Sequence, residues 1–356
     1  MNRIPNSIYS GKYCEGHVQG IAIDEEHGYV YYSFTTVLLK TDLKGTPVGC
    51  VNNLAGHLGC IAFDKATGHL YGSLEFKHDA IGKGIMARTG RIIAEEDAFY
   101  IASFECDKID RMDLDAEKDG VMRAAYLRDV VKDFLDDDEI SGKKHRYGCS
   151  GIDGISVGPT FGDRSGEDKI MVAYGIYGDT ERGDNDHQVI LQFAKKDIES
   201  YSAPLSLAAP HHTGPEECEK RYFFYTGNTT YGIQNLEYDS FSGNWFVAVY
   251  AGKKESFANF NMFVIDGNKA PAILPLAGRG EERGRLLYHA GIGEKGKGGE
   301  IYGSFFPYGS TGMISLGDGL FCFSENGQIK EEKAFYTYIK KYRYSPERSD
   351  LFEPAE

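Results

Sequence analysis

The sequence predicts an all-β protein, folded as a five-bladed β-propeller with four-stranded antiparallel blades. Three observations predict it: a segment recurs after 40 residues, five apolar runs share its outline, and further strand-like runs follow each of them. The segment GHVQGIAIDEEHGYVYYS at 16–33 returns as GHLGCIAFDKATGHLYGS at 56–73. Repeats of this length are typical of propellers, whose small sheets stand around an axis and protect their short edges.

The first strand of each repeat is the predicted inner strand. Its residues are apolar on both faces, as expected of a strand buried on both sides. A turn that begins with Asp and ends with Gly follows three of these runs, because Asp bonds its own turn backbone and Gly accepts positive φ. We place the inner strands at 17–24, 57–64, 151–158, 232–239 and 310–317.

The remaining strands are runs rich in Tyr, Val and Phe, two or more after each inner strand. In the last repeat, ENG at 325–327 predicts a tight hairpin between the final two strands. Because a ring must close, we expect an N-terminal strand at 7–13 to complete the last sheet, which makes residues 1–356 one propeller domain.

The long gap between the second and third inner strands predicts an insertion in the ring. It contains DGVMRAAYLRDVVKDFLDDDE at 119–139, whose apolar residues recur at helical spacing. We therefore expect a short amphipathic helix around 120–136, with an apolar face made by Val121, Ala125, Val130, Val131 and Phe134.

The blade pattern resembles a known kind of repeat. An apolar run, Asp, Gly and then a V/L-Y-x-S run is similar to the β-propeller repeats of the NHL and YVTN kind. The resemblance covers most of the chain. It implies the fold and no activity.

Composition excludes some classes of partner. The net charge is −14 and Lys and Arg form no stripe, which argues against nucleic acid. The chain lacks a run of 18 apolar residues and an apolar leader, so we expect no membrane span and a cytoplasmic protein. A trimmed signal peptide would leave the same sequence, so secretion stays open. The seven cysteines include no C-x-x-C pair, and nothing in the sequence indicates an oligomeric state.

Polar residues gather where the inner strands should reach the axis. The alignment of the repeats puts Gln19, Gly59, Asp153, Gln234 and Gly312 at one level, and His17, His57, Gly151, Gly232 and Ser310 at another. Burying such side chains costs several kcal/mol unless they meet partners, water or a ligand. Two explanations remain open: a water-filled tunnel in which they satisfy one another, and a binding site at the channel mouth.

A site at the mouth would use these residues in distinct ways. Asp153 with His17 or His57 could hold a divalent cation, the one cofactor for which the sequence gives a basis. Gln19, Gln234 and Asn235 could position a small polar ligand. The ligand-binding set is completed by three tyrosines that precede a glycine before inner strands and whose rings could stack on a sugar: Tyr147, Tyr231 and Tyr308.

Three classes of function follow. The first is binding of a small polar ligand such as a carbohydrate. The second is a metal-assisted hydrolase or lyase acting on glycosides, uronides or lactones, with Asp153, His17 and His57 as catalytic residues and a second carboxylate from Glu237, Glu75 or a loop. The third is a protein-interaction scaffold, which propeller folds often serve. We take the first forward as the main hypothesis, and enzymatic status stays open.

Overall fold

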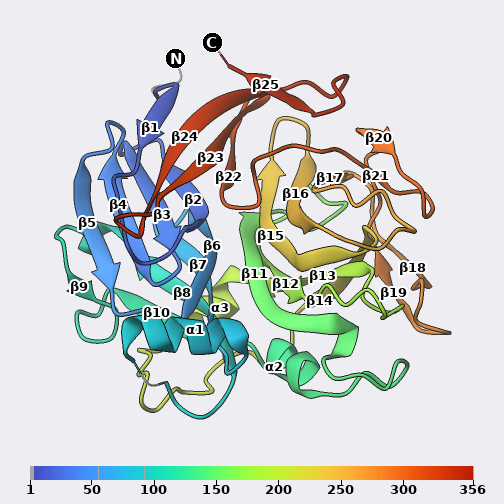
Figure 1. Ribbon diagram of the computed structural model, residues 1–356, viewed down its shortest axis with the longest axis horizontal. Coiled ribbons are helices and arrows are strands. Elements are labelled where there is room, and N and C mark those ends of the chain that lie inside the picture. The colour runs from blue at the N-terminus through green and yellow to red at the C-terminus, as the bar shows by residue number, and fades with distance from the viewer. Residues whose placement is uncertain (1–3, 55, 92, 356) are drawn as a thin grey trace.

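Residues 4–54, 56–91 and 93–355 are described by the structure, a computed structural model, and they form a five-bladed β-propeller (Figure 1). Each inner strand contacts the next around a closed ring. In order these strands are β2 (Val18–Asp24), β6 (His57–Asp64), β11 (Cys149–Gly158), β15 (Thr229–Asp239) and β22 (Met313–Gly317). The predicted fold class and the fold-level resemblance to propeller repeats are both confirmed.

The blades differ in their number of strands. Blade one adds β3 (Tyr29–Phe34), β4 (Val37–Asp42), β5 (Pro47–Asn52) and the parallel β9 (Leu114–Asp115) to β2. Blade two adds β7 (His69–Phe76), β8 (Ala98–Glu105) and β10 (Met122–Tyr126) to β6. Blade three adds β12 (Lys169–Ile176), β13 (His187–Ala194), β14 (Lys220–Tyr225), β19 (Arg283–Leu286) and β18 (Ala272–Pro275) to β11.

Blade four consists of β15, β16 (Asn244–Ala251) and β17 (Met262–Ile265). Blade five joins β22, β23 (Leu320–Ile329), β24 (Ala334–Tyr344), β1 (Ser7–Tyr9) and β25 (Phe352–Pro354). A separate pair is formed by β20 (Glu294–Lys295) and β21 (Tyr302–Gly303). Blade two therefore has the predicted four strands. Blade four has three strands, and blades one, three and five have more than four.

Five apolar clusters fill the spaces between neighbouring blades. One example joins Tyr31 and Leu38 of blade one to Leu70 of blade two, all buried. Equivalent clusters lie between blades two and three, three and four, four and five, and five and one. Burial on both faces explains why the inner strands carry apolar residues in succession.

The N-terminal strand lies at the edge of the last blade. β1 pairs antiparallel with β24 through Ser7–Tyr9, which is shorter than the predicted 7–13. Tyr13 makes one further bridge to Phe335. Figure 1 shows both ends of the chain beside β24 and β25. That this strand holds the ring closed, and that the whole chain is one domain, stay predictions.

Two local predictions need correction. The expected helix begins later, as α2 (Arg128–Leu135), because Met122–Tyr126 pairs with β8 as the outer strand of blade two. The predicted hairpin at 325–327 is wrong: Gly327 lies within β23, opposite Tyr336, and the chain turns at 330–333. A Cβ at Gly327 would require the end of the Tyr336 side chain to move.

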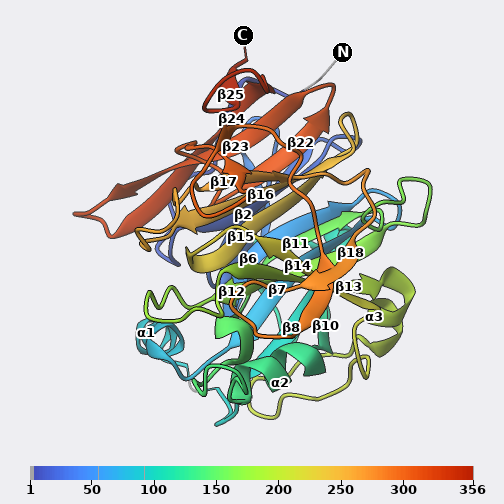
Figure 2. The ribbon, with the colours of Figure 1, turned by 90° about the vertical axis from the view of Figure 1, so that its right-hand side faces the viewer.

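Two helices join α2 in the described residues, α1 (Ala80–Thr89) and α3 (Lys195–Tyr201), and short 3-10 turns lie at Cys106–Lys108 and Arg146–Gly148. Asp79 caps α1 by accepting hydrogen bonds from the amides of Ile81 and Gly82. The helices gather at the end of the molecule away from β23 and β24 (Figure 2). In the described part of the chain, no helix has the length and apolar character needed to cross a membrane.

Candidate functional site

Bulges aim polar side chains at one end of the axis. In four inner strands the pairing register shifts between Val18 and Gly20, Leu58 and Ile61, Ile152 and Ile155, and Ile233 and Asn235. The residues within these shifts include Gln19, Gly59, Asp153 and Gln234, the level that the sequence alignment predicts. A β-bulge redirects a side chain out of the regular alternation. The side chains of Gln19, Asp153 and Gln234 thereby line one cavity.

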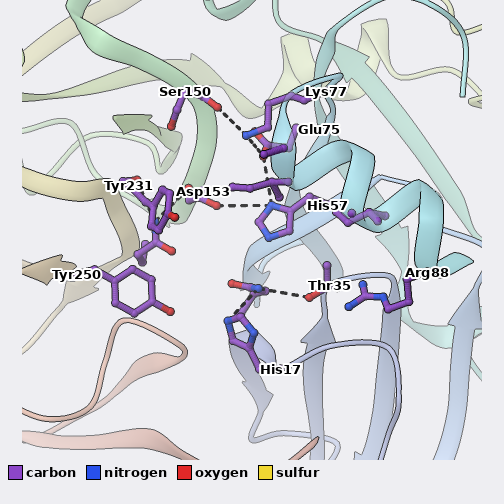
Figure 3. A pocket seen from close by; sticks show the side chains of 16 residues that line it. His17, Thr35, His57, Glu75, Lys77, Arg88, Ser150, Asp153, Tyr231 and Tyr250 are labelled. Carbon is purple, nitrogen blue, oxygen red and sulfur yellow. Dashed lines mark hydrogen bonds and ion pairs between the residues drawn. The ribbon is translucent and has the colours of Figure 1, made fainter. Parts of the chain in front are cut away.

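A cavity of about 520 Å³ lies at this end of the axis, between the inner strands and α1. Figure 3 shows the side chains that line it. Blades supply His17, Gln19, Thr35, His57, Glu75, Lys77, Ser150, Asp153, Tyr231, Gln234 and Tyr250, and α1 supplies Ala80, Ile81, Gly84, Ile85 and Arg88. The helix therefore forms one wall of the cavity.

The centre of the polar wall is a cluster of five side chains. His57 Nδ1 lies 3.3 Å from Glu75 Oε1 and 3.7 Å from Asp153 Oδ1. Lys77 Nζ lies 2.6 Å from Glu75 Oε1, and it also donates to the Ser150 carbonyl at 2.7 Å. Gln234 Nε2 donates to Asp153 Oδ2 at 3.1 Å. Glu75 is thus the second carboxylate, one of those that the sequence left open.

Backbone geometry holds Glu75 in place. Its Oε2 accepts a hydrogen bond from the Ile152 amide at 3.0 Å. Gly151 adopts a φ of +117°, and a Cβ at this position would clash with the same carboxylate oxygen. Glycine is therefore required here both for conformation and for space.

The two carboxyl groups differ in protonation. Burial and the nearby Glu75 charge raise the pKa of Asp153 to about 7. Burial opposes ionisation of Glu75 as well, but the Lys77 charge and the nearby His57 imidazole outweigh it and hold the pKa of Glu75 below its usual value. Glu75 is therefore the fixed anion of the cluster, while Asp153 exchanges its proton near neutral pH.

His17 lies in the cavity wall but outside this cluster. Its Nε2 is 3.2 Å from Gln19 Nε2, which also contacts Thr35 Oγ1 at 3.4 Å. Burial, together with the charges of His57 and Arg88, lowers the pKa of His17 to about 4. Among the residues that the structure describes, potential metal-ligand atoms of His57, Glu75 and Asp153 lie within 4.8 Å of one another. The potential ligand set therefore contains Glu75, whereas the sequence prediction included His17.

The structure separates the predicted tyrosines. The Tyr231 ring lies in the cavity wall, 43% exposed, beside Tyr250 at a centroid distance of 6.2 Å. The other two lie away from the lining, so the expectation that they stand at the mouth is wrong. Tyr147, with a φ of +58°, turns its ring onto Arg279, and its hydroxyl donates to Glu282. Tyr308 packs against Phe306 and Tyr342.

Asn235 crosslinks the inner strands instead of facing the cavity. Its Nδ2 donates to the Gln19 carbonyl at 2.9 Å, and its Oδ1 accepts from Cys60 Sγ at 3.2 Å. At the same level the backbone of Gly20 lies close to that of Cys60, which leaves little space between these two inner strands. The polar cavity therefore ends in a packed floor, which differs from an open water-filled tunnel.

The cluster has the donors and acceptors for proton transfer and for binding hydroxyl groups. His57, Glu75 and Asp153 also offer one imidazole and two carboxylates, a set that suits a divalent cation. The Lys77 ammonium already pairs with Glu75 and would repel such an ion. Thr35, Lys77, Arg88, Ser150 and Tyr250 were not among the residues that the sequence singled out.

Comparison with known proteins does not assign the chain to a family. No protein-family model and no curated protein matches the chain. A putative exo-β-1,3-galactanase from Bifidobacterium bifidum s17 is 10% identical over 94% of this chain and 93% of that chain, with a TM-score of 0.40. The pyranose dehydrogenase PQQ domain from Coprinopsis cinerea is 10% identical over 90% and 81%, with a TM-score of 0.35.

The Dos1 propeller is 10% identical over 86% of this chain, with a TM-score of 0.36. This chain spans 52% of that structure. The five-bladed assignment rests on the sheets themselves, whose inner strands close a ring in this chain.

Proposed function

We propose that the protein binds a small hydroxylated ligand, about the size of a monosaccharide, in the axial cavity. The observation that supports this most is the lining: a cavity of about 520 Å³ combines a wall of hydrogen-bonding groups with two tyrosine rings. Sites for small molecules commonly have this size and a few convergent polar groups.

The polar wall matches a ligand rich in hydroxyl groups. Asp153 and Gln234 present two acceptor oxygens side by side, because Gln234 Nε2 already donates to Asp153 and to the Tyr231 carbonyl. Gln19 and His57 add further groups across the cavity. Hydroxyl groups both donate and accept, so one ring could pair with several of them. Polar groups that are partly withdrawn from water are stabilised most by such hydrogen-bond partners.

The aromatic wall supplies an apolar face. Tyr231 stands at a φ of +65°, an uncommon conformation for a residue with a side chain, and its carbonyl accepts a hydrogen bond from Gln234 at 3.0 Å. That bond ties the Tyr231 backbone to the polar wall. A tyrosine offers a flat apolar surface together with a polar tip, which suits the C–H face of a sugar.

Arg88 favours an acidic ligand. This α1 side chain lines the cavity, and no hydrogen bond or ion pair from its guanidinium is found among the described residues. The Arg88 side chain is exposed to solvent; partial burial lowers its pKa against the opposing charge of Glu15, and the arginine stays protonated. Guanidinium groups pair with carboxylates through two hydrogen bonds. Sugar acids should therefore bind better than neutral sugars.

Calorimetric titration tests the proposal. The panel is glucose, galactose, glucuronate and galacturonate, measured with the wild type, Asp153→Asn and the control Asp168→Asn, whose exposed carboxylate lies at the other end of the axis. We expect saturable binding of a uronate that weakens at least tenfold in Asp153→Asn and stays unchanged in the control. Equal binding by all three proteins, or no saturable binding of any sugar, would reject it.

A second candidate is an acid–base hydrolase or lyase at the same site. The observation in its favour is Asp153, whose pKa of about 7 matches a group that both gives and takes a proton at neutral pH. His57 Nδ1, 3.7 Å away, is placed to share that proton. Turnover of aryl glycosides, glycuronides or lactones that is lost in Asp153→Asn and kept in Asp168→Asn would establish it.

The metal-assisted form of this candidate has its own test. Dialysis against Zn²⁺, Mn²⁺ or Ca²⁺ followed by elemental analysis should show one equivalent of metal in the wild type and less in Asp153→Ala if the three ligands hold an ion. The Lys77→Met variant should then bind more tightly, because the competing ammonium is removed. Equal metal content in all three proteins would reject it.

A further inference from the structure

The opposite end of the propeller axis holds a second cavity of about 590 Å³. It is enclosed by the far ends of the five inner strands and lies beyond the floor made by Asn235. Its wall is partly polar and partly apolar. The half-buried side chains Phe63, Val157, Ile314 and Leu316 face it together with the buried Ile23. A concave surface that combines apolar side chains with a few polar groups often marks a binding site.

The Glu237 carboxylate, one of three that line the cavity, stands beside these apolar side chains. Glu237, in β15, lines the cavity, and its Oε1 accepts a hydrogen bond from the Ser315 amide at 2.9 Å. Within the described residues, no basic nitrogen lies within 4.0 Å of this carboxylate. Lys65 is on the rim, but it pairs with Glu25 at 3.6 Å. A carboxylate in such surroundings lacks a counter-ion.

The surroundings of Glu237 are acidic overall. The groups around it are Asp239 in the same strand, Lys65 and the Cys60 thiol, with Asp64 and Asp168 farther along the wall. Lys195 compensates Asp64 at 3.0 Å. Burial, followed by the Asp239 charge, raises the pKa of Glu237 to about 8. A cation placed at the carboxylate would restore the ionised form.

We infer that this second cavity binds an organic ammonium ion, with its charged head on Glu237 and its hydrocarbon part against Phe63, Ile314 and Leu316. Charge-assisted hydrogen bonds are about twice as strong as neutral ones, and burying hydrocarbon adds affinity in proportion to its area. The site is separate from the polar cavity and does not depend on the function proposed there.

Hexylammonium chloride is the probe that tests the inference. Hexan-1-ol and hexanoate share its chain but replace the cation by a neutral or negative head. Calorimetric titration of the full chain at pH 8 should show saturable binding of hexylammonium, at least tenfold weaker binding of hexan-1-ol and none of hexanoate. Equal affinity for the ammonium and the alcohol would overturn the inference, as would the absence of ammonium binding.

Variants locate the site. Glu237→Gln keeps the size of the side chain and should weaken hexylammonium binding at least tenfold, whereas Asp153→Asn in the other cavity should leave it unchanged. Leu316→Gln, on the half-buried wall, should weaken it several-fold and covers the case that Glu237→Gln fails to fold. Unchanged affinity in both variants of this wall would contradict the assignment.

The dependence on pH separates this site from nonspecific binding to surface acids. Because the ammonium pairs with the ionised form, binding should release a proton from Glu237, and the heat should vary with the ionisation enthalpy of the buffer. Affinity should rise roughly tenfold or more between pH 6 and pH 8, since each unit below the pKa reduces the ionised fraction about tenfold. A flat profile over this range would contradict the role of Glu237.

Discussion

Lys77 Nζ lies 2.6 Å from Glu75 Oε1, and both side chains are almost wholly buried beside the axial cavity. Removing one partner of a buried ion pair leaves the other charge uncompensated, which typically destabilises a protein by about 3 to 5 kcal/mol. We predict this loss in the free energy of unfolding for both Lys77→Met and Glu75→Gln, measured by chemical denaturation.

The double variant and a surface pair provide the controls. Lys77→Met with Glu75→Gln should lose clearly less than the sum of the single variants, because neither charge is left alone. Lys12 and Glu332 form an ion pair with side chains 46% and 53% exposed, and Lys12→Met should change stability by less than about 1 kcal/mol. Additive losses in the buried pair would contradict the coupling.

Gly151 is predicted to be essential for the position of Glu75. Gly151→Ala introduces a Cβ against the Glu75 carboxylate at a left-handed φ, so it should both destabilise the protein and abolish uronate binding. Gly68→Ala is the matched control, since Gly68 has a φ of +72° with no atom within 4 Å of the added Cβ. It should show only the backbone effect of about 1 kcal/mol. Equal losses in the two variants would show that packing against Glu75 is unimportant.

Asp153 should make stability depend on pH. Its folded pKa of about 7 lies above the usual 3.8, so between these values the folded protein keeps a proton that the unfolded chain releases. Stability from this group is therefore present at low pH and is lost as pH rises toward 7, with a slope of up to about 1.4 kcal/mol per pH unit. Denaturation series from pH 4.5 to 8 should show a flatter profile for Asp153→Asn. Identical profiles would contradict the raised pKa.

Arg88 should select acidic ligands. Arg88→Gln removes the charge from the cavity wall and should weaken uronate binding about tenfold while leaving a neutral sugar unaffected. Lys83→Gln removes the same charge from an exposed position of α1 outside the lining and should change neither. Calorimetric titration with glucuronate and glucose compares them. A similar loss for both sugars would assign Arg88 a structural role.

The ring-closing role of β1 can be tested at Ile8. This side chain is buried between β1 and the first blade, so Ile8→Ala should destabilise the protein by about 2 to 4 kcal/mol. The neighbouring Ser7 is exposed, and Ser7→Ala should be close to neutral. Deletion of residues 1–13 should lower the melting temperature further. An unaffected melting temperature after deletion would show that the ring does not need this strand.

The ring and its axial residues were predictable because they follow from a repeat. The 40-residue offset aligns Gln19 with Gly59, and the remaining copies then align Asp153 and Gln234, which do reach one cavity. Conversely, the turn-like ENG failed as a hairpin signal because strand pairing with β24 outweighs local turn preference.

The partners of the site were harder to predict, for physical reasons. The register of Asp64 with His69, continued without interruption, would place Phe76 opposite His57. The bulge after Leu58 shifts the pairing by one residue and brings Glu75 there instead. Arg88 depends on the helix inserted after β7, whose docking over the cavity is a tertiary contact without a local signal.

Ligand binding in the axial cavity can be observed in a crystal structure of the protein soaked with glucuronate. We expect density for a sugar ring in the axial cavity, with hydroxyl groups within hydrogen-bonding distance of Asp153 and Gln234, the ring over Tyr231 and the carboxylate at Arg88. An empty cavity at saturating ligand, or a cavity filled by side chains because the four bulges are absent, would contradict this expectation.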